Sequence, residues 1–218
     1  MTEEAANAPR TPFIEPSDAV YRGALAVQRA VEENEELLGR LDAYAGDGDH
    51  GSTIAAGARA AVAGMAPLGN SGQRILDAGL AFSEASGGAS GALYGSLIQA
   101  VGRAVLSGNG PASAIRTGVQ RVQELGKAEV GDKTMIDALR PFCDELDALL
   151  AEGVPLGNAW TRAAIVATEN AAQTAALVAR RGRAANLGER SIGGADAGAT
   201  SAALALTALG SVFREADR

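Results

Sequence analysis

The segment "RILDAGLAFSEASGGASGALYGSLIQAVGRAVL", residues 74–106, consists of two alanine-rich apolar stretches separated by Gly87 and Gly88. Adjacent glycines in a helical pattern predict a break, because glycine loses the most backbone entropy on entering a helix. Ser90 follows them and can cap a second helix that ends near Leu106. A connection this short favours antiparallel packing of the two helices.

Helical spacing of apolar residues continues on both sides of this segment. About eight helices are expected, and no pair of stretches predicts a strand hairpin. The composition agrees, since 47% hydrophobic but only 4% aromatic residues suit closely packed helices. We therefore predict an all-α antiparallel bundle, with helices over residues 17–41, 52–65, 74–86, 90–106, 111–126, 134–153, 155–179 and 199–213.

Local signals refine this assignment at three places. Asp137 lies three residues after Thr134, which makes an acidic variant of the capping box. Pro141 predicts a kink in the same helix. The polar stretch over residues 180–198 is predicted to be an extended loop.

The 218 residues predict one domain. We expect residues 1–15 to be a mobile N-terminal arm, because prolines and scattered charges leave little to bury, and residues 16–218 to form the domain. The N-terminus lacks the pattern of a signal peptide. No stretch reaches the roughly 18 uninterrupted apolar residues that a membrane span needs.

Charge and cysteine content narrow the class of protein further. The net charge of −7 has no compensating basic stripe, which argues against binding to nucleic acid or to an anionic membrane. The single cysteine, Cys143, is typical of a reducing compartment and is expected to be a buried apolar filler. We expect a cytoplasmic protein that binds a small anion at a local site.

Four glycine-containing loops, at residues 46–51, 87–91, 126–131 and 193–198, follow alternate helices or nearly so. Alternate connections of an up-and-down bundle lie at the same end. Backbone amides at helix starts attract anions, and glycine permits close approach. The sequence therefore predicts a ligand site at one end of the bundle.

The first of these loops lies in "AYAGDGDHGSTIAAG", residues 43–57. Its glycines resemble a phosphate-binding P-loop, but Ser52 stands where that motif has lysine. Asp42, Asp47 and Asp49 lie close together with no basic residue among them, so their repulsion requires hydration or a cation. The spacing excludes an EF-hand. Oxygen ligands of this kind favour Mg²⁺, which can join carboxylates to phosphates.

The alternative is an exposed turn in which Asp47 and Asp49 only cap the following helix. His50, the only histidine, can contact phosphate, serve as a polar contact or act as a base. Ser52 and Thr53 can cap the helix or donate to phosphate. Among the arginines of the late loop, one can stabilise transferring phosphate charge while the others form a solvated basic patch; they are Arg180, Arg181, Arg183 and Arg190. Asp196 can act as the N-cap of the last helix.

Several ordered motifs resemble the nucleotide-binding L subunit of dihydroxyacetone kinase (DhaL type), which also occurs as a fused domain of single-chain kinases. They are "LDAYAGDGDHGST", "GGASGALYGS", "GDKTMIDAL", "GRAANLGERSIG" and "DAGATSAALALTAL", and the match runs from about residue 17 to about residue 213. The resemblance implies an eight-helix antiparallel barrel-like bundle that holds ADP or ATP with two Mg²⁺ ions at one end. Asp42, Asp47 and Asp49 match the family's metal ligands.

The resemblance also implies which residues contact the nucleotide. These are His50, Gly51, Ser52, Thr53, Ala89, Ser90, Gly126, Met135, Arg183, Asp196, Ala197 and Gly198. Arg183 is expected to stabilise phosphate. The last three residues correspond to a motif usually written Asp-Pro-Gly, and alanine replaces proline here.

In this family the sugar is held covalently by a histidine of a separate K-type subunit or domain. The resemblance therefore implies a K-type partner that binds a small ketose, and little kinase activity without it. The phosphate source is either ATP or a phosphotransferase-system protein that rephosphorylates bound ADP, and the ketose is dihydroxyacetone or a relative such as erythrulose. A homodimer is expected. The alternative function is a nucleotide-sensing module that reports phosphorylation state to a regulator.

Overall fold

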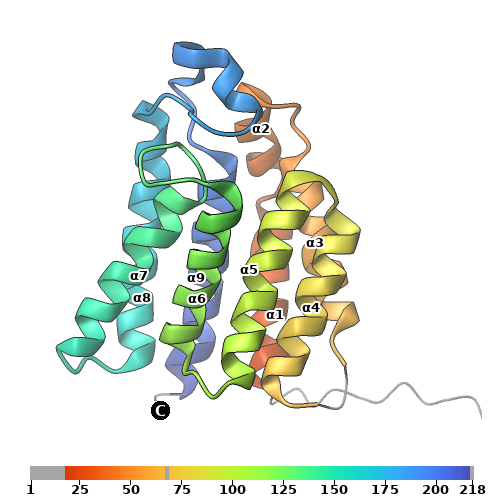
Figure 1. Cartoon of the computed structure of the whole chain (residues 1–218), viewed down its shortest axis with the longest axis vertical. Helices are drawn as coiled ribbons and strands as arrows, with labels where there is room; N and C mark the ends of the chain where they lie inside the picture. Colours follow the sequence, from red (N-terminus) through yellow and green to blue (C-terminus); the bar gives the residue numbers. More distant parts are fainter. Residues whose placement is uncertain (1–17, 67–68, 217–218) are drawn as a thin grey trace, which may run out of the picture.

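The computed structural model describes residues 18–66 and 69–216, and over these residues the fold is all-α (Figure 1). The described residues form nine α-helices and two 3₁₀ helices and contain no strand, which confirms the predicted class. The predicted arm, residues 1–15, and the predicted helix start at Ser17 lie outside the described residues. The helices are α1 (Ala19–Glu33), α2 (Glu35–Ala45), α3 (His50–Gly64), α4 (Ser71–Ser86), α5 (Gly88–Leu106), α6 (Pro111–Gly126), α7 (Ile136–Ala151), α8 (Leu156–Gln173), η1 (Thr174–Ala176), η2 (Arg183–Ser191) and α9 (Ala197–Ala216).

The helices from α3 onward alternate in direction, as Figure 1 shows. Each helix from α3 to α8 packs against the next α-helix along the chain, and α9 packs against both α8 and α1. The connections α2–α3, α4–α5, α6–α7 and α8–α9 consequently lie at the same end of the bundle, the upper end in Figure 1. The predicted antiparallel arrangement is confirmed for these helices.

The single helix predicted over residues 17–41 is instead two helices, which meet at Asn34. The Asn34 side chain donates a hydrogen bond to the carbonyl of Ala30 at 2.8 Å, and its backbone leaves the helical region (φ −112°, ψ 11°). A short polar side chain that bonds to the preceding turn offers the backbone an alternative to helix. The second helix, α2, therefore packs separately against α3 and reaches the loop end of the bundle.

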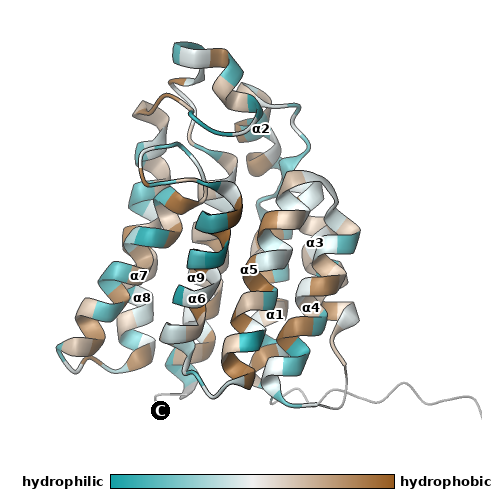
Figure 2. Ribbon diagram, viewed as in Figure 1, coloured by the Kyte–Doolittle hydropathy of each residue, from teal (hydrophilic) through white to brown (hydrophobic). Residues whose placement is uncertain are grey.

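The α4–α5 pair shows how glycine brings two helices together. A Cβ atom at Gly79 would lie 3.1 Å from the carbonyl oxygen of Gly95, and one at Gly102 would lie 2.9 Å from that of Gly72. The backbones touch at these positions, which recur every two turns on each helix. Figure 2 shows hydrophobic residues along both helices. The sequence of this segment thus determines a closely packed hairpin.

The predicted break at Gly87 and Gly88 is confirmed, because both adopt positive φ angles (61° and 57°) that favour glycine. The predicted cap at Ser90 is wrong. Gly87 occupies the N-cap position and α5 begins at Gly88, so Ser90 lies within the first helical turn.

Helix α8 ends at Gln173 rather than near Ala179, and the predicted polar loop contains η2. The chain turns at Thr174, which is fully buried and whose hydroxyl donates to the carbonyl of Ala171 at 2.5 Å. The same hydroxyl accepts from the backbone N–H of Asp196 at 2.8 Å. A long-range hydrogen bond therefore ends this helix, and local helical spacing could not reveal it.

Aromatic packing joins α7, α8 and α9 in the core. Trp160 lies edge-on to Phe142 (centroids 4.9 Å apart) and beside Phe213 (4.3 Å), and its indole N–H donates to the carbonyl of Leu206 at 2.8 Å. Cys143 is 1% exposed, and burial raises its pKa to about 12. The expectation that it fills the core as an unreactive thiol is confirmed.

The predicted acidic capping box lies at the start of α7. The Asp137 carboxylate accepts from the backbone N–H of Thr134 at 2.7 Å, as the acidic capping box requires, although the helix itself begins at Ile136. Pro141 lies inside α7, which continues on both sides of it.

None of the helices in the described part of the chain combines the length and apolar character needed to cross a membrane.

Candidate metal centre

The glycine-containing loops lie together at the upper end of the bundle in Figure 1. The Tyr44 hydroxyl donates to the carbonyl of Ile192 at 2.5 Å, which joins the end of α2 to the chain before α9. Ser90 Oγ lies 3.5 Å from His50 Nδ1, which joins the starts of α5 and α3. The expectation of a polar, glycine-rich end is confirmed.

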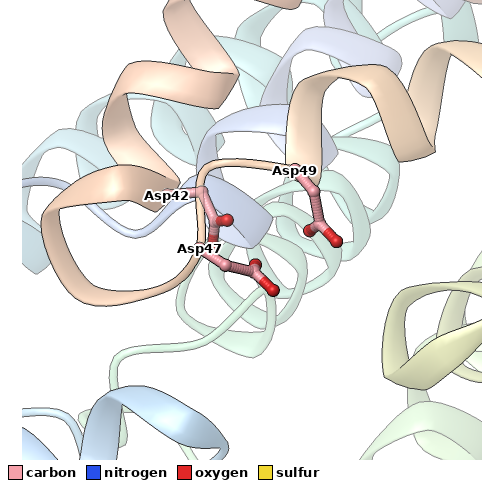
Figure 3. Close-up of side chains that lie close together, drawn as sticks. All are labelled: Asp42, Asp47 and Asp49. Atoms are coloured by element: carbon pink, nitrogen blue, oxygen red, sulfur yellow. The ribbon is translucent and has the colours of Figure 1, made fainter.

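Three carboxylates gather in the loop between α2 and α3. Asp42 lies on α2, Asp47 in the loop and Asp49 directly before α3, and one oxygen from each lies within 4.8 Å of the others. Figure 3 shows the three side chains on the same side of the loop. Asp47 and Asp49 are exposed and Asp42 is partly buried, so a ligand can reach the cluster from solvent.

The two glycines of this loop shape the cluster. Asp42 Oδ2 accepts the backbone N–H of Gly48 at 2.8 Å, and Gly48 adopts a positive φ of 81°. A Cβ atom at Gly46 would collide with the Asp42 carboxylate. Glycine at position 48 permits the turn, and glycine at position 46 leaves room for the Asp42 carboxylate. The hydrogen bond from Gly48 orients this carboxylate before any ligand binds.

The capping alternative for Asp47 and Asp49 is wrong. Asp49 stands at the N-cap position of α3, but its side chain makes no capping hydrogen bond. Ser52 instead donates its hydroxyl to the Asp49 carbonyl at 2.9 Å. The Asp47 carboxylate pairs with Arg183, which lies far away in the sequence. Neither aspartate is used to cap the helix that follows.

The electrostatics of the cluster favour a cation. The hydrogen bond from Arg183 holds the pKa of Asp47 below its usual range. The pKa of Asp49 is raised, first by its partial removal from water and then by the negative charges of Asp47 and Asp42. A positive ion among these oxygens would lower the repulsion and favour all three charged forms. The cluster has the donor set of a hard divalent cation.

Arg183 is the arginine of the late loop that reaches the aspartates. It begins η2 and remains largely exposed (68% of its side chain), so its ion pair with Asp47 contributes little to stability. Arg181 donates instead to Asp132 at 3.0 Å, whereas Arg180 and Arg190 are exposed. The structure thus brings one of the four candidate arginines to the carboxylates.

His50 does not join the carboxylate cluster but lies buried beside it. Its Nε2 is 2.8 Å from Ser201 Oγ, which lies 2.7 Å from the Tyr94 hydroxyl, and Tyr94 donates to the carbonyl of Gly198 at 3.1 Å. Burial lowers the pKa of His50 and favours the neutral ring. This histidine therefore links α3 to α5 and α9. Of its three possible roles, the structure supports that of a polar contact.

The residues after His50 have different environments. Gly51 is buried where α3 crosses α2, and a Cβ atom there would overlap the carbonyl of Glu35. Ser52 is exposed at the helix start, and the carbonyl of Thr53 accepts a hydrogen bond from Ser86 at 3.1 Å. Gly51 is required for packing, and Ser52 is the more accessible of the two hydroxyl residues.

The other candidate contacts come from three further loops. Ala89 is exposed and Ser90 partly buried in the first turn of α5, and Gly126 is the last residue of α6. Met135 is 5% exposed, and its Cβ lies 3.7 Å from the position that a Cβ atom would take at Gly198. Among the described contacts, none links Gly126 to the aspartates.

Asp196 caps α9, as predicted. Its Oδ1 accepts the backbone N–H of Ala199 at 2.6 Å, and burial followed by the charge of Asp137 raises its pKa to about 6. Ala197 is buried and Gly198 partly buried in the first turn of α9. The cap therefore belongs to the structure, and any ligand contact here would be additional to it.

One charged residue of this end was not identified from sequence. Lys133 is 4% exposed, and its ammonium donates to the carbonyls of Thr174, Leu177 and Gly194 at 2.8, 3.3 and 2.7 Å. Burial lowers its pKa. In the sequence it lies in the motif "GDKTMIDAL", but no spacing of apolar residues indicates that its side chain is buried. Its positive φ of 61° and its distant partners are visible only in the folded chain.

The sequence is similar to known proteins over most of its length. The sequence matches the DAK2 domain over residues 44–211. The chain belongs to the DAK2-domain family. It is 33% identical to the ADP-binding subunit DhaL of a PTS-dependent dihydroxyacetone kinase from Lactococcus lactis, over 79% of this chain and 85% of that protein. The resemblance to the DhaL type is thereby confirmed.

Longer proteins also match this DAK2-domain chain. It is 43% identical to the D-erythrulose kinase of Mycolicibacterium smegmatis over 85% of this chain, and it spans only 33% of that kinase. The structure is similar to that of the dihydroxyacetone kinase from C. freundii in complex with AMP-PNP and Mg²⁺, with a TM-score of 0.69 and 27% identity. That similarity covers 97% of this chain and 37% of the C. freundii chain.

Proposed function

We propose that this chain binds a magnesium complex of ADP or ATP and serves as the nucleotide-binding component of a kinase that phosphorylates a small ketose. The observation that carries the proposal is the convergence of Asp42, Asp47 and Asp49, with carboxylate oxygens within 4.8 Å of one another at the loop end. The L. lactis relative is named an ADP-binding subunit, and the C. freundii kinase was solved with AMP-PNP and Mg²⁺. Both support this ligand class.

The aspartates fit magnesium in chemistry and number. They offer only oxygen atoms, and a small set of carboxylates leaves coordination positions for water and phosphate, as Mg²⁺ prefers. The proposal assigns two ions to the cluster, which is a common arrangement in phosphoryl transfer. When bound, magnesium would neutralise charge on the phosphates. The contribution of the chain is to hold and orient the carboxylates, for Asp42 through the N–H of Gly48.

The nucleotide would lie against the surrounding loops. The starts of α3 and α5 lie side by side through Ser90 and His50, and helix N-termini favour anions. Arg183, now paired with Asp47, would move to a phosphate once metal takes over that carboxylate. The full proposed set is His50, Gly51, Ser52, Thr53, Ala89, Ser90, Gly126, Met135, Arg183, Asp196, Ala197 and Gly198.

The ketose would be held by another polypeptide or domain. The only histidine of the chain, His50, is buried between Ser201 and Ser90, so it is poorly placed to bind a ketone covalently. The M. smegmatis D-erythrulose kinase is about three times as long as the region matched here. We therefore propose a K-type partner for the domain of residues 16–218, with residues 1–15 as an arm. Dihydroxyacetone and erythrulose are the proposed substrates, and the protein is proposed to be a homodimer.

Calorimetric titration of ADP with and without Mg²⁺ tests the nucleotide site. Loss of groups that merely support metal ligands lowers affinity by about 10- to 100-fold, so Asp47→Ala, which removes a ligand, should lower magnesium-dependent affinity by at least about 100-fold. Helicity should be unchanged. Asp144→Ala, on the exposed face of α7, is the matched control and should bind like the wild type. Unchanged binding by Asp47→Ala would disprove the metal assignment.

A kinase assay with and without a K-type partner tests the reaction. The chain alone should bind nucleotide without phosphorylating ketose, and the partner should restore transfer. Activity of the chain alone would contradict the need for a partner. Binding without transfer even with the partner would favour the nucleotide-sensing module. Comparison of free ATP with a phosphotransferase-system donor in the same assay separates the two phosphate sources.

A further inference from the structure

The segment that carries Arg183 leaves the bundle after η1 and returns just before Asp196. We call residues 178–193 the arginine loop, and its two stems are Leu177 and Gly194. Arg183 is the first residue of η2 in this loop and pairs with Asp47. Because the loop contains only short 3₁₀ structure, its position depends on contacts with the rest of the protein.

One buried ammonium contacts both stems. Lys133 Nζ donates to the carbonyl of Leu177 at 3.3 Å and to that of Gly194 at 2.7 Å, which are the residues flanking the loop. Its third acceptor, the carbonyl of Thr174, lies where α8 ends. Hydrogen bonds from a charged donor are stronger than those between neutral groups. The ammonium therefore connects the exit and the return of the loop at a single point.

The cost of this arrangement argues for a specific role. Lys133 is 4% exposed and has no direct ion pair with a carboxylate in the described part of the chain, and the charges of Asp196 and Asp137 offset only part of the effect of burial on its pKa. Its backbone has a positive φ of 61°, which is unfavourable for a residue with a Cβ atom. Taking a charge out of water costs free energy, and an apolar side chain of similar volume often stabilises a core as much or more. Stability alone therefore does not account for a lysine at this position.

Neighbouring contacts hold residues of the loop itself. The carbonyl of Asp132 accepts the backbone N–H of Arg180 at 3.0 Å, and its carboxylate accepts from Arg181. Within the loop, Ser191 Oγ accepts the N–H of Ala179 at 2.9 Å and donates to the carbonyl of Gly188. Residues 132 and 133 thus contact the loop and its stems at several points, and the ammonium of Lys133 lies buried among these contacts.

We propose that Lys133 is a positioning residue: its ammonium fixes both stems of the arginine loop and thereby holds Arg183 at the aspartate cluster. The role of Arg183 toward phosphate rests on the proposed function, whereas the fixing of the loop does not. Lys133 itself touches neither the aspartates nor, in this proposal, the nucleotide.

Hydrogen exchange of the unliganded full chain tests the fixing of the loop. Lys133→Met keeps the length of the side chain and removes the donors, so amides of residues 178–193 should exchange at least about tenfold faster. Amides in α4 and α5 should be unchanged. Lys127→Met is the matched control, because Lys127 also has a positive φ (48°) but is exposed. Unchanged exchange in the loop of Lys133→Met would overturn the proposal.

A double-mutant cycle with calorimetry tests the link to Arg183. Lys133→Met should weaken binding of Mg·ADP by about tenfold in the wild type, but by less than about twofold in an Arg183→Ala background. Equal losses in both backgrounds would mean that Lys133 acts independently of Arg183 and would overturn its positioning role. If the wild type binds no Mg·ADP, the proposed function fails, while the exchange experiment still decides whether Lys133 fixes the loop.

A second variant covers the case in which Lys133→Met does not fold, as judged by circular dichroism. Ser191→Ala removes the hydrogen bonds to Ala179 and Gly188 inside the loop and leaves Lys133 unchanged. It should speed exchange of the loop and weaken Mg·ADP binding only when Arg183 is present. Faster exchange with unchanged binding would show that the position of the loop does not matter for the ligand, and would overturn the proposal.

Discussion

The α4–α5 hairpin and the loop end of the bundle belong to one fold but are held together by different interactions. In the hairpin, glycines at positions 72, 79, 95 and 102 bring two helical backbones into contact, and hydrophobic residues cover both helices (Figure 2). At the loop end, the chain is held by hydrogen bonds to charged side chains such as Lys133, Asp137 and Asp196.

The hairpin and the loop end therefore differ in what they contribute: the hairpin contributes stability, and the loop end contains the candidate site. Close packing of small and apolar residues lowers the free energy of the folded state, and the glycine contacts between α4 and α5 involve no charged side chain. The loop end instead buries Lys133, partly buries Asp196 and crowds Asp42, Asp47 and Asp49, which costs free energy. Changes in the hairpin should therefore affect stability alone, and changes at the loop end should affect binding or its dependence on pH.

The largest effect on stability is expected from Gly79→Ala combined with Gly95→Ala. The added methyl groups would lie 2.8 Å from the backbone nitrogen of Gln99 and 2.6 Å from Cβ of Ser83, so the helices must separate. Overpacking of this kind costs about 1–3 kcal/mol per site, and we expect a loss of about 2–4 kcal/mol in urea unfolding. Mg·ADP affinity should stay within about twofold, because the helices still form.

The matched control for this pair is Gly110→Ala. Gly110 has a negative φ of −70° and no atom within 4 Å of its Cβ position. Its substitution adds no close contact but replaces the N-cap glycine of α6, and it should change stability by less than about 1 kcal/mol. If the double variant of the hairpin is as stable as this control, backbone contact does not limit the packing of α4 and α5.

An intermediate effect on the free energy of unfolding is expected from Asp196→Asn. The pKa of Asp196 is raised from 3.8 to about 6, so between these values the folded state binds more protons than the unfolded state and stability falls as pH rises. Asparagine keeps the capping oxygen for Ala199 and removes the charge. The variant should be more stable at pH 7 by about 1–3 kcal/mol, since one pKa unit corresponds to about 1.4 kcal/mol.

Denaturation at two pH values checks this prediction. Below about pH 4 the wild-type carboxyl is also neutral when folded, so the difference between Asp196→Asn and the wild type should disappear. A loss of stability at pH 7 would mean that the charge of Asp196 is compensated at the loop end, for instance by Lys133, and that burial of this charge does not destabilise the loop end.

The smallest effect on stability is expected from Tyr44→Phe. Tyr44 is 50% exposed, and its hydroxyl donates to Ile192 at the end of the arginine loop. Loss of one exposed hydrogen bond should lower stability by about 0.5–1 kcal/mol in thermal melting. Faster hydrogen exchange should be confined to residues 190–194, because the ring itself still covers Gly193 and Gly194. Faster exchange across α4 and α5 would contradict the separation of the two regions.

Much of the fold could be predicted from local patterns. Apolar spacing predicts seven helices near their observed positions, and Gly87 and Gly88 mark the turn between α4 and α5 where the structure has it. The predictions fail where a side chain forms a bond that spacing does not encode. Asn34 divides the first helix by bonding to Ala30, and Thr174 ends α8 through partners near α9.

The candidate site was predictable only in part, for the same reason. Asp42, Asp47 and Asp49 could be grouped because they are neighbours in the sequence, and the fold brings their oxygens together. The partners of His50 lie 40 and 151 residues away, and those of Lys133 lie 41 to 61 residues away. No local signal marks either residue as buried.

The sequence by itself determined that the chain is helical, where the α4–α5 hairpin turns, and that carboxylates gather before α3. These properties depend on residues within a few positions of one another, whose backbone preferences and spacing act directly. Only the tertiary structure decided that His50 is buried rather than open to solvent, that Arg183 reaches Asp47, and that Lys133 lies beneath the arginine loop. Those outcomes depend on which loops meet at one end of the bundle, and the packing of distant helices determines that.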